Sequence, residues 1–145
     1  MDSGYQDDEE GIIMRSEPAT IYPLVSSSGN ERVLKDWLAD HESYSLVEED
    51  RPVTGTEFDL CIVDKEGLQR HKDELRDLKS EAEPTLLPVL LLLSERDSEI
   101  IETDRGEIAD NVLVSTIDEI VSLPMRQAEL EWRIHALLRL RNQSL

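Results

Sequence analysis

The chain has 145 residues, a length that suits one domain with a single core. It carries 33 acidic residues against 15 basic ones, a net charge of −18, and this sign argues against partners such as nucleic acid or an anionic membrane surface. No apolar run reaches the roughly 18 residues of a transmembrane helix. The acidic N-terminus also lacks the apolar region of a signal peptide, so a cytoplasmic protein is predicted.

The acidic charge has a second implication. Net charge this high, with only 4 lysines among the 15 basic residues, is typical of a halophilic source such as a halophilic archaeon, where acidic surfaces stay solvated in strong salt. Cys61, the single cysteine, lies inside an apolar run. We therefore expect a small buried hydrophobic side chain there and no reactive thiol.

Residues 1–18 predict an acidic flexible tail, because five of the first ten are acidic and no apolar period is present. A single domain is expected over residues 19–145. Five short apolar runs in it predict strands at Thr20–Val25, Tyr44–Glu49, Asp59–Val63, Pro88–Ser94 and Glu119–Leu123. Pro23 suits an edge or a bulge better than a central strand.

Helical patterns alternate with these strands. A capping box of Ser28 and Glu31 opens the first helix, a second spans Leu68 to about Glu83, and Pro124 starts a long last helix. A short helix is expected at 98–104, and a loop at 50–56. The expected core faces are Val33, Leu34, Trp37 and Leu38; Leu68, Leu75, Leu78 and Ala82; and Leu130, Ile134, Leu137 and Leu138.

This alternation predicts an α/β fold, a three-layer α/β/α sandwich around a five-stranded parallel sheet. Binding sites in such sheets form at the carboxyl ends of the strands. Val25, Asp64 and Ser94 lie at the carboxyl ends of three expected strands. Asp64 is therefore a candidate site residue, although an aspartate there can also simply end the strand or cap the next turn.

Several short motifs in this order resemble the receiver domain of two-component signalling. "DLCIVD", Asp59 to Asp64, is similar to the family's "DLxxxD" pattern, whose last aspartate accepts a phosphoryl group. "DEIVSLP", Asp118 to Pro124, is similar to the family's "DDYLxKP", and "AELEWRIHALLRLR" resembles its last helix. The resemblance covers about residues 19–141 and places Asp64 at the phosphoacceptor position.

The other functional positions of a receiver hold different residues. The adjacent acids that help to hold Mg²⁺ correspond to Ser26 and Ser27, and the lysine before the last proline corresponds to Leu123. The switch hydroxyl falls on Leu93, or on Ser94 with a one-residue shift. Two hydroxyls replace two carboxylates as metal ligands, and no lysine is left to neutralise the phosphoryl group.

The resemblance therefore implies a degenerate receiver, or pseudo-receiver, that signals by protein–protein contact without enzymatic activity, metal or cofactor. One alternative is a genuine phosphoacceptor that uses Asp64 and Mg²⁺ in an altered site. Another is a small-ligand sensor binding near Ser26, Asp64 and Ser94. No nucleophile–base pair and no metal-spaced cluster is present, His41, His71 and His135 are isolated in sequence, and "SSSG" before the first helix lacks the pattern of a phosphate-binding loop.

The last helix carries a second apolar stripe, separate from its core face. Trp132, Ala136 and Leu140 recur at a spacing of four residues and lie on another side of the helix. Trp132 can lie flat on the protein's own surface, or the stripe can contact a partner. We expect the partner to be a downstream sensor or kinase domain, or a second copy in a homodimer.

Overall fold

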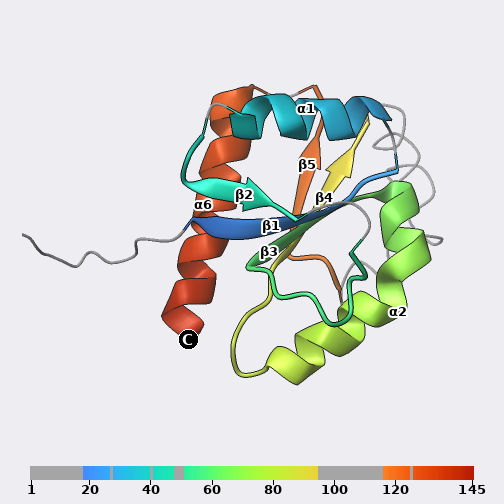
Figure 1. Cartoon of the computed structure of the whole chain (residues 1–145), viewed down its shortest axis with the longest axis vertical. Helices are drawn as coiled ribbons and strands as arrows, with labels where there is room; N and C mark the ends of the chain where they lie inside the picture. The colour runs from blue at the N-terminus through green and yellow to red at the C-terminus, as the bar shows by residue number, and fades with distance from the viewer. Residues whose placement is uncertain (1–17, 27, 40, 48–50, 95–115, 125) are drawn as a thin grey trace, which may run out of the picture.

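Five parallel strands form one sheet in the order β2-β1-β3-β4-β5 (Figure 1). This computed structural model describes residues 18–26, 28–39, 41–47, 51–94, 116–124 and 126–145. The strands are β1 Ala19–Leu24, β2 Tyr44–Leu46, β3 Leu60–Asp64, β4 Val89–Leu93 and β5 Glu119–Ser122. The predicted α/β class and five-stranded parallel sheet are confirmed. The helix expected at 98–104 lies outside the described residues, and so does the expected tail except for residue 18.

Helices cover both faces of the sheet (Figure 1). Helices α1, Ser28–Ala39, and α6, Gln127–Ser144, pack on one face, and α2, Lys65–Ala82, packs on the other. Strand β3 is buried on both sides: Leu60 and Ile62 belong to the core under α1 and α6, while Cys61 and Val63 belong to the core under α2. Because both faces of such a strand are covered, its sequence is a continuous apolar run.

The buried cysteine is confirmed. Cys61 has no exposed surface, and burial raises the pKa of its thiol far above the usual value. The thiolate, which is the reactive form, is therefore suppressed.

The connection from β2 to β3 contains no helix in its described part, residues 51–59. Val53 and Phe58 are buried there, and Phe58 meets the ring of Tyr22 edge-on at 5.2 Å between centroids. Gly55 has a φ of 89°, a left-handed conformation that favours glycine in the turn. The expected loop is thus confirmed over its described residues, and it covers part of the sheet in place of a helix.

Pro23 lies in β1, an interior strand by order, but β1 pairs with β2 only over Ala19–Ile21, so the proline has an edge-like position on that side, as expected. Two other predicted details are wrong. Helix α6 begins at Gln127 rather than at Pro124. Val33 is 45% exposed and is not core, whereas the other expected face residues of α1, Leu34, Trp37 and Leu38, are buried.

The excess of acid lies outside the three described helices. Helix α1 has two acidic and two basic residues, α2 has five of each, and α6 has two acidic and three basic. The net charge of −18 therefore comes from the connections, the strand ends and the N-terminal residues. Helix α6 is the one described helix with a positive net charge, and the halophilic source stays a prediction.

We expect Ile134→Ala to lower the free energy of unfolding by about 2–5 kcal/mol, as truncation of a core side chain does. Ile134 is fully buried between α6 and the sheet, in the stripe with Leu130 and Leu137. Urea unfolding followed by circular dichroism measures the change. Trp132→Ala is the matched control on the same helix, because that indole is 69% exposed; equal losses for the two variants would contradict this assignment of the core face.

Candidate functional site

Asp64 ends β3 and is the N-cap of α2. Its Oδ1 atom accepts a hydrogen bond from the backbone N–H of Gly67 at 2.8 Å, and its Oδ2 atom accepts one from the backbone N–H of Ser26, also at 2.8 Å. The residue is only 4% exposed. One carboxylate thus joins the segment that follows β1 to the first turn of α2, and both of its oxygens are engaged by the backbone.

Gly67 lets this helix start close to β1. A Cβ atom at this position would stand 1.8 Å from the carbonyl oxygen of Leu24, so any larger residue must displace backbone. The close approach brings the N–H of Gly67 to the carboxylate of Asp64 and the helix N-terminus to the end of β1. The glycine three residues after the aspartate is therefore required by packing as well as by capping.

Among the described residues, the other positions of the receiver motif add no acidic or basic side chain next to Asp64 in sequence register. Ser26 is exposed and contributes its backbone N–H, and Ser27 lies outside the described residues. Leu93 is buried in the core under α2, whereas Leu123 packs against the core under α1 and α6. The backbone N–H of Leu123 donates to the carbonyl of Leu93 at 2.7 Å, which extends the β4–β5 ladder. Ser94 follows β4 and is half-buried.

This set of side chains does not fit Mg²⁺. The ion prefers several hard oxygen ligands, with carboxylates among them. Asp64 supplies a single carboxylate, one lone pair of each of its oxygens is taken by a backbone N–H, and Ser26 adds only a neutral hydroxyl. Within the described part of the chain, no group of three or more histidine, cysteine or acidic side chains is placed to hold a metal ion.

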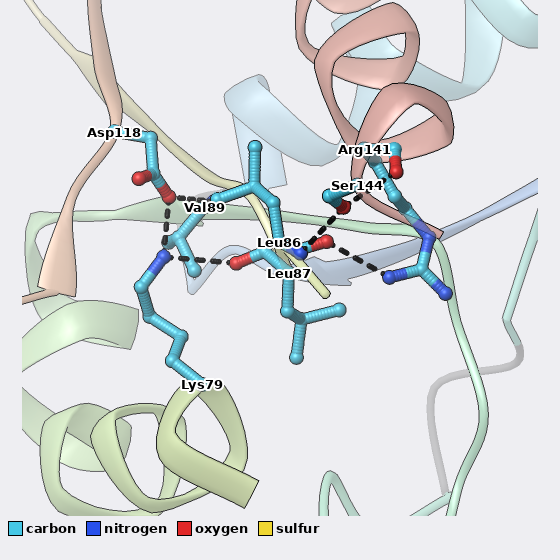
Figure 2. Close-up of polar contacts among 7 residues, drawn as sticks. All are labelled: Lys79, Leu86, Leu87, Val89, Asp118, Arg141 and Ser144. Carbon is cyan, nitrogen blue, oxygen red and sulfur yellow. Dashed lines mark hydrogen bonds and ion pairs between the residues drawn. The ribbon is translucent and has the colours of Figure 1, made fainter. Parts of the chain in front are cut away.

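Two other motif aspartates act at the opposite, amino end of the sheet. Asp59 precedes β3, and its Oδ2 atom accepts from the N–H of Thr20 at 2.8 Å. Asp118 precedes β5, and its Oδ2 atom accepts from the N–H of Val89 at 2.8 Å and from Lys79 Nζ at 2.5 Å (Figure 2). Each aspartate therefore accepts from one backbone N–H near the start of a neighbouring strand.

The last turn of α6 is fixed to the same end of the sheet (Figure 2). Arg141 donates through Nε to Asp59 at 3.2 Å and through Nη1 to the carbonyl of Leu86 at 2.9 Å. Ser144 Oγ accepts from the N–H of Leu86 at 2.7 Å. On the other side of this loop, Lys79 donates to the carbonyl of Leu87 at 2.9 Å. The segment between α2 and β4 is thus held by both helices.

The histidines and the second apolar stripe lie away from Asp64. His71 pairs with Glu74 within α2, at 2.7 Å. His41 and His135 are isolated in sequence but link elements in the fold. His41, after α1, contacts Glu131 on α6, and His135 on α6 contacts the hydroxyl of Tyr44 on β2. In the stripe, Trp132 is 69% and Leu140 50% exposed, while Ala136 is half-buried. No pattern in the sequence pointed to the roles of His41, Arg141 and Ser144.

The fold is that of solved receiver proteins. A response regulator from Thermotoga maritima superposes with a TM-score of 0.59 at 16% identity, covering 84% of this chain and 98% of that one. A CheY-like response regulator from Mesorhizobium loti gives 0.53 at 15% identity, covering 83% and 99%. A protein described as an adenylate cyclase from Rhodopirellula baltica gives 0.55 at 13% identity, covering 87% and 91%.

At these identities the likeness shows the fold alone. No model of a protein family matches the sequence, and a search of curated proteins finds no match. Among the described residues, no helix is long and apolar enough to span a bilayer. The chain therefore has the receiver fold, and its function has to be inferred from its own residues.

Removal of the Asp64 carboxylate tests its capping role. We expect Asp64→Ala to lower the free energy of unfolding by about 1–3 kcal/mol, because both backbone donors lose their acceptor. Asp64→Asn should cost less, since its amide oxygen can still accept one of the two bonds. Urea unfolding of the three proteins measures this order. An Ala variant as stable as the wild type would show that the carboxylate has no structural role.

Proposed function

We propose that the chain is a degenerate receiver, a signalling module of the two-component type that acts by protein–protein contact and not by catalysis. The observation that carries the proposal is the engagement of both Asp64 oxygens by backbone N–H groups. A phosphoacceptor needs an oxygen that is free to attack phosphorus and charges that stabilise the transferred group. In Asp64, attack on phosphorus competes with capping of α2. Ser26 and Leu123 carry no charge that could stabilise the transferred group.

The alternative phosphoacceptor function is tested directly. We expect incubation with Mg²⁺ and acetyl phosphate, or with beryllium fluoride, to give no stable adduct at Asp64. Intact-mass spectrometry and thermal melting are the measurements, with an active receiver protein as the positive control. A stoichiometric adduct that disappears in Asp64→Asn would reject the degenerate function and favour the altered phosphoacceptor. Melting scans with small metabolites test the ligand-sensor alternative in the same format.

The proposed contact surface is the stripe of Trp132, Ala136 and Leu140 on α6. It lies on a different side of the helix from the buried residues Leu130 and Ile134, and it leaves an indole 69% exposed. Large aromatic side chains frequently dominate the energetics of protein interfaces. Helix α6 also lacks the acidic excess of the chain, so a second acidic copy, or an acidic sensor or kinase domain, can approach it with less repulsion.

We take a second copy of the chain as the partner to test first. Trp132→Ala should weaken self-association about 30-fold, the equivalent of about 2 kcal/mol at an interface anchor, and should leave the unfolding curve nearly unchanged. Sedimentation equilibrium over a range of concentrations measures this. Val33→Ala is the matched control, because Val33 is an exposed apolar residue on α1, outside the stripe. A wild type that stays monomeric at every concentration would eliminate the homodimer.

A further inference from the structure

His41 faces two hydrogen-bond acceptors with its two ring nitrogens. Nδ1 lies 2.8 Å from the carbonyl oxygen of Trp37, in the last turns of α1. Nε2 lies within hydrogen-bond distance of the carboxylate of Glu131, on α6. A carbonyl and a carboxylate only accept, and a neutral imidazole has a single N–H. Both contacts therefore exist together only when His41 is a doubly protonated cation.

Two aromatic rings flank the imidazole. The imidazole lies 4.6 Å from the ring of Trp37, centroid to centroid, with the planes inclined by 30°. From β2, the ring of Tyr44 lies 6.3 Å away, and its hydroxyl contacts Nδ1 of His135 on α6 at 3.1 Å. Burial, together with the charge of Glu131, raises the pKa of Tyr44, so this phenol stays neutral while histidine titrates.

The opposite end of α6 is held by groups that do not change charge in the same pH range. Arg141 binds the carboxylate of Asp59. It also binds the carbonyl of Leu86, and Ser144 binds the N–H of Leu86 (Figure 2). An arginine keeps its charge at any pH a protein tolerates. Loss of the His41 proton would therefore loosen the first half of α6 and leave its last turn in place.

We propose that His41 and Glu131 form a pH-dependent latch between the end of α1 and the first half of α6. In acid the imidazolium makes both contacts and the latch is closed. As the pH rises past the point at which His41 gives up its proton, one contact is lost and the latch opens. Glu131 immediately precedes Trp132, so the latch acts on the segment that carries the exposed indole. The latch does not depend on the state of Asp64.

Hydrogen exchange of α6, followed by NMR, tests the latch. The exchange rates are compared at about pH 5.5 and about pH 8, which lie on either side of the ordinary imidazole pKa near 6.5. The rates are corrected for the pH dependence of intrinsic amide exchange. The amides of residues 130–137 should exchange about fivefold faster at the higher pH, as expected for one partly exposed ion pair. Those of the last turn should not change. A first half of α6 with pH-independent protection would overturn the proposal.

Two variants identify the group responsible. In His41→Gln, the amides of residues 130–137 should exchange at both pH values at the rate of the wild type at high pH. Glu131→Gln removes the other partner of the pair and should give the same result, so it serves if His41→Gln does not fold. His71→Gln is the matched control, because the pair of His71 with Glu74 lies within α2 and links no two elements. Retention of the pH dependence in both His41→Gln and Glu131→Gln would also overturn the proposal.

Discussion

The carboxylate of Asp64 is the contact on which the arrangement of this end of the sheet depends. It joins three parts of the chain: the segment that follows β1, the end of β3 and the first turn of α2. Gly67 makes the contact possible, because only a residue without a side chain fits against the carbonyl of Leu24. A helix N-terminus placed there would otherwise leave backbone N–H groups without acceptors near a buried strand.

The motif aspartates share one chemical task. Asp59, Asp64 and Asp118 each accept a hydrogen bond from a backbone N–H of another segment, and two of them also pair with a base on a helix. The receiver-like spacing of these acids can thus be explained by the folding of a parallel sheet, without phosphoryl transfer. A receiver-like pattern of acids therefore does not by itself imply the function of a receiver.

Much of the fold was predictable because it depends on local periodicity. Continuous apolar runs predicted β3 and β4, and the apolar stripes predicted the buried faces of α2 and α6. The capping of α2 by Asp64 was among the expected interpretations of that residue. Its second contact, with the N–H of Ser26, required the two strand ends to be placed side by side.

Contacts between distant segments were not predictable. His41 and Glu131, or Arg141 and Asp59, carry no mutual signal in one sequence, since their approach depends on how α6 crosses the sheet. The edge-like position of Pro23 inside an interior strand arises because the short β2 leaves that part of β1 unpaired on one side. The exposure of Val33 likewise depends on the angle at which α1 lies on the sheet.

The central claim is that both oxygens of Asp64 are occupied by the backbone. Hydrogen exchange of the Ser26 and Gly67 amides, measured by NMR in the wild type, tests it most directly. We expect both amides to be protected, by about 100-fold or more relative to an unstructured chain, because each is bound to the buried carboxylate. An unprotected Ser26 amide would contradict this arrangement, since the Oδ2 atom of Asp64 would then lack its backbone donor.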